Sequence, residues 1–391
     1  GARHDSPLVV GLGEGENFLG SDVAAFVAYT KRAMEVDQDQ AVCVSADKVI
    51  VADFNGNVVE NPKTYTVDWD ASAAEKGGWD SFMDKEIHED PAAVQRTLLG
   101  RFDTNGDITL DEVRIDEHDF KAIDKIIVVA CGTASYAGQV AKYAIEHWVR
   151  IPVEIELAHE FRYRDPILTP RTLVVAISQS GETMDTLMAL RHAREQGSKV
   201  LAICNTQGAS IPRESDAVLY THAGPEVAVA STKAFVAQIT AAYLLGLYLA
   251  QVKGAMFRDE IHQMLDSLKD MPRKIQWVLD TQPKTIQAAA ERMVNANSFL
   301  FLGYPVALEG ALKLKEIAYT FTEGFAAGEL KHGPIALVDE GEPVVFIVPP
   351  QRGRNVLHAK VISGIEEVKA RGAYIIAVAA LLNGQQIPVG V

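Results

Sequence analysis

The chain has 391 residues and a formal net charge of −15, from 37 basic and 52 acidic side chains. This charge argues against nucleic acid and anionic membranes as partners, because both repel an acidic surface. The 3 cysteines, Cys43, Cys131 and Cys204, are far apart and form no CxxC pair, which predicts a reducing, cytoplasmic compartment and no structural zinc. The most hydrophobic stretch, residues 239–250, is too short to span a bilayer, so we expect a buried helix there.

The beginning of the chain predicts a small β-rich segment over residues 1–70. Strands are expected at residues 7–11, 41–44 and 48–52, and a hairpin turn at residues 55–57. A charged helical stretch follows from about Lys76 to Leu99. Residues 100–121 are acid-rich and loop-like, which is typical of a linker.

Two motifs in this region are rejected as binding sites. The glycines of residues 11–15 lack the GxGxxG spacing and the βαβ context of a dinucleotide loop. Residues 103–107 are similar to a calcium loop, but Ile108 stands where glycine is needed and Arg114 where glutamate is needed.

The rest of the chain predicts two α/β units with parallel sheets, because continuous apolar runs alternate with helical patterns. The first unit has expected strands at 126–130, 173–177, 200–204 and 217–220, helices at 139–149 and 184–196, and a long apolar helix from about Ser231. The second has strands at 299–303, 344–348 and 374–378 and helices at 306–319 and 355–371, with no clear βα pair after Ala380. Each unit opens with a strand, a glycine and a helix that carries Gly138 or Gly310 in its first turns, which indicates an internal duplication. With right-handed crossovers, each unit becomes a three-layer α/β sandwich.

A hydroxyl-rich turn follows one of the buried strands, and it is the most specific motif of the chain. It reads Ser178-Gln179-Ser180-Gly181-Glu182-Thr183. Free backbone N–H groups and the positive end of a helix dipole meet at such a strand-to-helix turn, which suits a phosphate. Helix capping is the alternative, although capping does not need three hydroxyls. The absence of a GxxxxGK[ST] loop favours a phosphorylated small molecule over a nucleotide.

Two further segments lie at helix starts and are weaker signals. Residues 131–135, Cys-Gly-Thr-Ala-Ser, follow the neighbouring strand, although a buried cysteine at a strand end is usually only a small hydrophobe. Residues 229–233, Val-Ala-Ser-Thr-Lys, begin the long apolar helix, where Ser231 or Thr232 as an N-cap explains the pattern equally well.

Candidate proton-transfer groups occur in the second unit. Lys313 and Glu316 share a face of a helix, where a carboxylate base could lie beside an ammonium group. Surface salt bridges of Lys313 with Glu309 and Glu316 are the plainer interpretation. His332 lies in a loop bounded by glycine and proline, which suits proton transfer, but a structural histidine explains it as well.

These motifs, in this order, resemble the glucosamine-6-phosphate synthase family, also called glutamine–fructose-6-phosphate transaminase (isomerizing). The resemblance rests on residues 131–133, 178–183, 229–233, 307–316 and 328–334, and it covers nearly the whole chain. Residues 11–18 with Ser21-Asp22 resemble the end of that family's glutaminase domain. The resemblance implies two sugar isomerase (SIS) subdomains that add ammonia from glutamine to fructose 6-phosphate and release glucosamine 6-phosphate. It implies no cofactor and no metal, and a homodimer.

The resemblance also implies roles for individual residues. Glu316 would be the base that moves a proton between sugar C1 and C2, Lys313 would assist it, and His332 would open the sugar ring from the neighbouring subunit. Sugar-phosphate contacts are implied for Cys131, Gly132, Thr133, Ser178, Gln179, Ser180, Thr183, Val229 and Ser231.

The chain departs from the family pattern in several places. The N-terminal cysteine and most of the glutaminase are absent, as is the C-terminal tail with its Schiff-base lysine, since no lysine follows Lys369. Ala134 stands where serine is commoner. We therefore expect the chain as written to lack glutamine hydrolysis and full synthase turnover.

The expected organisation has four segments, and one alternative function stays open. Residues 1–74 would be the end of a glutaminase domain, 75–119 an interdomain helix and linker, 120–270 the first SIS subdomain, and 271–391 the second, which ends early. The alternative is a sugar-phosphate-sensing SIS module without catalysis, which would need the phosphate turns but not Glu316 and His332.

Overall fold

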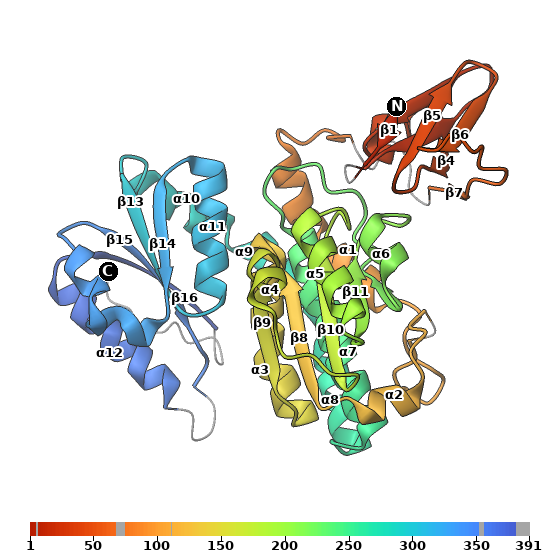
Figure 1. Ribbon diagram of the computed structural model, residues 1–391. Coiled ribbons are helices and arrows are strands. Elements are labelled where there is room, and N and C mark those ends of the chain that lie inside the picture. Colours follow the sequence, from red (N-terminus) through yellow and green to blue (C-terminus); the bar gives the residue numbers. More distant parts are fainter. Residues whose placement is uncertain (5–6, 68–74, 111, 352–355, 381–391) are drawn as a thin grey trace. The chain divides into compact units, whose positions relative to one another are not determined.

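The computed structural model describes residues 1–4, 7–67, 75–110, 112–351 and 356–380 (Figure 1). The chain forms two compact units, Gly1–Ile275 and Gln276–Val391. The β-rich start of the chain belongs to the first of these units. The further division into four segments stays a prediction.

Two small antiparallel sheets form the β-rich start of the first unit. One has the strand order β1 (Ala2–Arg3), β5 (Gln40–Val44), β6 (Val49–Asp53), and the other β3 (Asn17–Gly20), β2 (Val9–Leu12), β4 (Arg32–Glu35), β7 (Thr64–Thr66), with the short η1 (Val23–Ala25) beside it. The expected hairpin turn is confirmed, because the Asp53 carboxylate accepts hydrogen bonds from the backbone N–H groups of Asn55 and Asn57.

A five-stranded parallel sheet forms the centre of the first unit (yellow to green in Figure 1). Its strand order is β12 (Ala217–Tyr220), β11 (Lys199–Cys204), β10 (Thr172–Ser178), β8 (Lys125–Ala130), β9 (Val153–Leu157). The expected α/β fold with a parallel sheet is confirmed. Strand β9 was not expected, because Glu154 and Glu156 interrupt its apolar pattern at the edge of the sheet.

Helices cover both faces of this sheet, which makes a three-layer sandwich. Ile126 and Val128 pack into a core with helices α3 and α7, while Ile127 and Val129 face the opposite core under α4, α5 and α6. This alternation follows from the two-residue period of a strand. The helices are α3 (Gly132–Val149), α4 (Ala158–Arg164), α5 (Met184–Glu195), α6 (Ser210–Glu214) and α7 (Lys233–Lys253).

Helix α3 begins at Gly132, seven residues before the predicted start at Gln139. The predicted loop is therefore the first turn of the helix, and Cys131 is its N-cap. Gly138 lets the helix lie close to the sheet, since a Cβ there would be 2.8 Å from Val128 Cγ1. The N-terminus of α3, where the first backbone N–H groups have no acceptor in a preceding helical turn, thus lies at the end of β8.

The described residues of the expected linker, 100–110 and 112–121, are irregular up to residue 116, but they are not solvated throughout. Ile108, Leu110, Val113 and Ile115 are buried in the same core as α3 and α7. The sequence did not reveal this burial because the apolar side chains are spaced among acidic residues. The irregular segment lies between α1 (Phe82–Leu98) and α2 (Glu117–Ala122), so the last residues of the expected linker are helical.

Helix α7 is long and apolar enough to cross a membrane by length and composition alone. The apolar stretch of residues 239–250 is part of this longer helix, which begins upstream at Lys233 and includes Gln238, and both of these side chains are buried. The expectation of a buried helix was confirmed, since α7 packs against α3 and α1. Helices α8 (Arg258–Lys269), α9 (Met271–Thr281) and α10 (Pro283–Arg292) follow.

The second unit has a four-stranded parallel sheet and repeats the opening of the first. Its strand order is β14 (Phe321–Phe325), β13 (Ser298–Leu302), β15 (Pro343–Val348), β16 (Tyr374–Ala379), with α11 (Val306–Ala318), η3 (Ala327–His332), η4 (Pro334–Leu337) and α12 (Leu357–Ala370). A Cβ at Gly310 of α11 would lie 2.9 Å from the Phe301 ring of β13, just as Gly138 lies against β8. Strand β14 was not expected because Thr322, Glu323 and Gly324 break its apolar run. The expectation about the chain after Ala380 lies outside the described residues.

Candidate functional site

A cavity of about 170 Å³ lies at the carboxyl ends of β8 and β10 and beside the start of α7. Seven residues that the sequence singled out line it: Cys131, Thr133, Ser178, Gln179, Ser180, Thr183 and Ser231. Ala134, Ile177 and Gln238 complete the lining. The structure thus brings together three segments that are distant in the sequence. Gly132 and Val229 are not among the lining residues, and the Val229 side chain is 95% exposed.

The turn from β10 to α5 is built by hydrogen bonds among its own groups. Ser178 Oγ accepts from the backbone N–H of Gly181 at 3.0 Å and lies 3.0 Å from Thr183 Oγ1. Ser180 Oγ accepts from the N–H of Glu182 at 3.2 Å. Thr183 is the N-cap of α5 but makes no side-chain cap bond. The hydroxyls therefore shape the turn, and side-chain capping does not account for them.

Gly181 is required at this turn for two reasons. Its φ of +70° is unfavourable for other residues, and a Cβ there would lie 2.6 Å from Ala209 Cβ and 2.7 Å from Cys204 Sγ. The turn is consequently held close to the end of β11.

Two residues that line the cavity carry buried polar atoms with no hydrogen-bond partner among the described residues, Ser231 Oγ and Gln238 Oε1. Ser135 Oγ and Thr232 Oγ1, close in sequence to lining residues, are in the same situation. A buried polar group without a partner costs about 1–3 kcal/mol, so a bound molecule or water that supplied partners would be favoured. Gln238, only 2% exposed, was missed as a site residue, although a glutamine within an apolar helix was the available signal.

Carboxylates position the segment that carries Ser231. Glu226 accepts from the backbone N–H groups of Thr232 at 3.0 Å and Ala234 at 3.1 Å, and so caps α7 from outside the helix. The alternative of a side-chain N-cap at Thr232 is not observed. From α1, Glu86 accepts from the N–H of Val227 at 2.6 Å, and burial raises the pKa of Glu86.

A buried lysine ties the same segment to α1. The side chain of Lys233 is 2% exposed, and its Nζ lies 2.5 Å from Glu89 Oε2. Burial raises the pKa of the neighbouring Asp90 to about 7, and the negative charge of Glu226 adds to this effect. Helix α1 therefore supplies the acidic side chains Glu86, Glu89 and Asp90 near the start of α7.

The predicted proton-transfer residues lie on the second unit. Lys313 Nζ lies 2.6 Å from Glu316 Oε2 and 3.5 Å from Glu309 Oε1, so the salt bridges of the plainer interpretation are both present. Glu316 is partly exposed, and His332 is exposed at the end of η3. In the described part of the second unit, no hydrogen bond or ion pair joins His332 to Lys313 or Glu316.

A group of side chains that could hold a metal ion lies near the cavity. The ligand atoms of Cys131, His159 and Asp185 are all within 4.8 Å of one another. The sequence predicted no metal site, and these three residues are too far apart in the chain to form a recognisable motif.

Comparison with known proteins places the chain in a family. The SIS domain profile matches residues 120–248 and 300–385. Glutamine–fructose-6-phosphate aminotransferases (isomerizing) from Corynebacterium diphtheriae and Streptomyces coelicolor are 66% and 62% identical, and the alignments cover 97% of this chain but only 61% and 62% of those proteins. The chain thus spans about three fifths of the length of these relatives.

A solved structure agrees with these sequence matches. The C-terminal domain of glucosamine-fructose-6-phosphate aminotransferase from Francisella tularensis is 40% identical, with a TM-score of 0.74 over 78% of this chain and 84% of that chain. The family expected from the sequence motifs is confirmed. The chain belongs to the SIS domain family and, within it, to the glutamine–fructose-6-phosphate aminotransferases (isomerizing).

Proposed function

We propose that this chain carries the sugar-phosphate part of an enzyme that makes glucosamine 6-phosphate from fructose 6-phosphate and glutamine-derived ammonia. The observation that carries the proposal is the cavity beside β8 and β10, where seven predicted contact residues gather. The names of the relatives from Corynebacterium diphtheriae and Streptomyces coelicolor describe the same aminotransferase activity.

The turn after β10 is the proposed phosphate anchor. The first N–H groups of α5 have no partner within the helix and point toward this end of the sheet. Ser180 and Thr183 add hydroxyl donors at the cavity wall. The carboxylate of this turn does not oppose the anion, because Glu182 is engaged by the N–H and the hydroxyl of Ser210 at 2.8 and 2.7 Å. Arg3 also lies 3.5 Å from Glu182.

Proton transfer is proposed for Glu316, with Lys313 assisting and His332 opening the ring. Moving a carbonyl from C2 to C1 needs a base that takes a proton from one carbon and returns it to the other, which a carboxylate can do. The 2.6 Å contact with Lys313 holds the Glu316 carboxylate in one orientation. A histidine can relay the ring hydroxyl proton near neutral pH.

The proposed enzyme is a homodimer in the cytoplasm that receives ammonia from a glutaminase domain. The resemblance to the family implies that His332 enters the site of the neighbouring subunit, so a dimer is needed for activity. Analytical ultracentrifugation at the assay concentration tests this: activity should follow the dimer, and a fully active monomer would contradict the shared site.

Isotope exchange separates the enzyme from a sugar-phosphate sensor. With fructose 6-phosphate in deuterated water, the full-length protein should promote exchange of the proton at C1, whereas a sensor would bind the sugar without exchange. Tight binding with no exchange would reject the enzymatic proposal and favour the sensor. Absence of any hexose-phosphate binding would reject both.

A further inference from the structure

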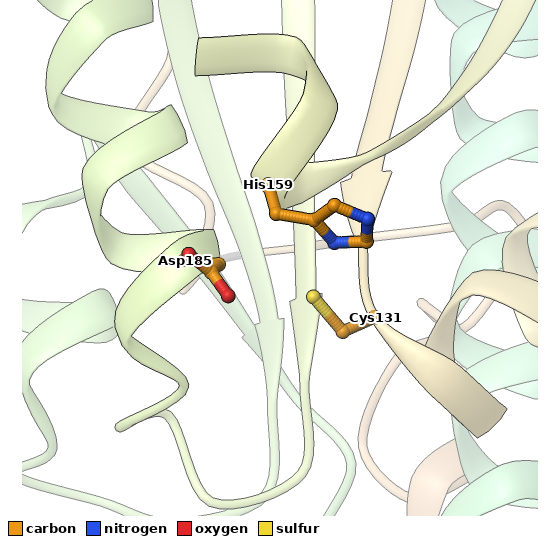
Figure 2. A group of neighbouring side chains, drawn as sticks. All are labelled: Cys131, His159 and Asp185. Carbon is orange, nitrogen blue, oxygen red and sulfur yellow. The ribbon is translucent and has the colours of Figure 1, made fainter. Parts of the chain in front are cut away.

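Three neighbouring parallel strands bring Cys131, His159 and Asp185 to one point. Strands β9, β8 and β10 are adjacent in the sheet, and their carboxyl ends lie at the same edge. Cys131 directly follows β8, while His159 and Asp185 are the second residues of α4 and α5. Figure 2 shows the sulfur, the imidazole and the carboxylate turned toward a common point, and their ligand atoms all lie within 4.8 Å of one another.

We propose that Cys131, His159 and Asp185 bind a zinc ion. Thiolate sulfur, imidazole nitrogen and carboxylate oxygen are the ligands zinc takes in proteins, whereas magnesium and calcium prefer oxygen alone. Three protein ligands leave the fourth tetrahedral position open for water. The negative charges of the thiolate and the carboxylate together balance the charge of the ion.

The surroundings of the cluster fit a site that is accessible from solvent. The side chains of His159 and Asp185 are 46% and 48% exposed, so an ion can enter without any opening of the fold. Glu160 Oε1 lies 3.6 Å from His159 Nε2 and can orient the ring, as carboxylates do for metal-bound histidines. Arg162 Nη1 lies 3.9 Å from Asp185 Oδ1, and a bound ion would replace Arg162 as the partner of this carboxylate.

The location of the cluster predicts an effect on the cavity. Cys131 lines the proposed sugar-phosphate cavity, so a zinc-bound Cys131 is no longer available to a ligand there. Zinc should therefore weaken hexose-phosphate binding. This consequence rests on the proposed function, whereas zinc binding itself does not.

The direct test is a zinc titration of the metal-stripped full-length protein without sugar, by calorimetry and by competition with a chromophoric chelator. Wild type should bind one equivalent of zinc. His159→Ala and Asp185→Asn should each weaken zinc binding by about tenfold or more, because each removes a ligand. Two matched controls, His4→Ala in the exposed His4–Asp39 pair and Cys43→Ser at an exposed thiol, should bind zinc like wild type. Unchanged affinity in both cluster variants, or an equal loss in the controls, would overturn the proposal.

Cobalt gives a readout that folding defects cannot imitate. A cobalt-loaded protein should show the thiolate-to-metal charge-transfer absorption of a sulfur ligand, and Cys131→Ser should lose this band while keeping the same thermal unfolding. Persistence of the band in Cys131→Ser would show that another cysteine holds the ion and would overturn the assignment.

The coupling to the cavity is measured separately. Without zinc, His159→Ala should bind fructose 6-phosphate like wild type; with zinc, the Kd should rise in wild type and stay constant in His159→Ala. A Kd that zinc leaves unchanged in wild type would overturn the coupling. If the protein binds zinc through the cluster but binds no hexose phosphate, the proposed function fails and the metal site stands.

Discussion

The hydroxyl oxygens of Ser178 and Thr183 lie 3.0 Å apart across the turn from β10 to α5. Because Ser178 Oγ also accepts from the N–H of Gly181 at 3.0 Å, one serine ties together both ends of the turn. The turn is therefore formed before any ligand arrives, and a preformed site loses little entropy on binding.

Loss of single hydroxyls from this turn should weaken hexose-phosphate binding. Thr183→Ala and Ser180→Ala each remove a donor at the cavity wall, and a hydrogen bond to a charged group contributes about 1.5–3 kcal/mol. Calorimetry with fructose 6-phosphate measures the change, and Ser267→Ala on the exposed face of α8 is the control. Unaltered affinity in both turn variants would contradict the phosphate assignment.

The carboxylate cap of α7 should matter for binding as well as for stability. Glu226→Gln weakens two hydrogen bonds to the backbone of residues 232 and 234, and loss of a cap typically costs about 1 kcal/mol. Amide hydrogen exchange should become faster at residues 227–234, and sugar-phosphate affinity should fall because Ser231 loses its position. The exposed Glu117→Gln in α2 controls for the change in charge. Faster exchange with unchanged affinity would show that this segment does not contribute to the site.

Because Asp90 is buried, the free energy of unfolding should fall as pH rises from about 4 to 7. Burial raises its pKa from 3.8 to about 7, with Glu226, Glu86 and Glu89 adding to the effect and Lys233 opposing it. Between about pH 4 and pH 7 the folded chain holds a proton that the unfolded chain has lost, so the free energy of unfolding falls as pH rises, by at most about 1.4 kcal/mol per pH unit.

Asp90→Asn removes this dependence, so the variant should gain stability over wild type as pH rises toward 7. Denaturant unfolding at several pH values between 4 and 8 measures the difference between the two proteins. A constant difference across this range would show that Asp90 does not titrate there.

The sequence predicted the strands that carry the site, because β8 and β10 are continuous apolar runs that are buried on both faces. It did not predict β9 or β14, whose glutamates and glycine hide the strand pattern. The early start of α3 was missed because Gly132 and Gly138 suggest a loop, whereas Gly132 is the first residue of the helix, with a φ of +52°, and Gly138 packs closely against Val128.

The candidate site was predictable only where its residues form local motifs. The turn after β10 could be found because its hydroxyls are contiguous. Gln238 and the cluster of Cys131, His159 and Asp185 depend on which strands are neighbours in the sheet, and local sequence does not contain that order. The role of Glu226 as a remote cap has the same origin.

The rate of proton exchange catalysed by the Glu316→Gln variant of the full-length protein tests the central claim, that Glu316 is the base, most directly. The substitution keeps the shape of the side chain and removes the base, so binding of fructose 6-phosphate should persist while proton exchange at C1 and C2 falls by about 10²–10⁴-fold. Glu309→Gln is the matched control, because it removes the other carboxylate that contacts Lys313. A purely structural salt bridge predicts a stability change of about 1 kcal/mol or less with normal exchange. Near-normal proton exchange in Glu316→Gln, with the same thermal unfolding as wild type, would contradict the proposed mechanism.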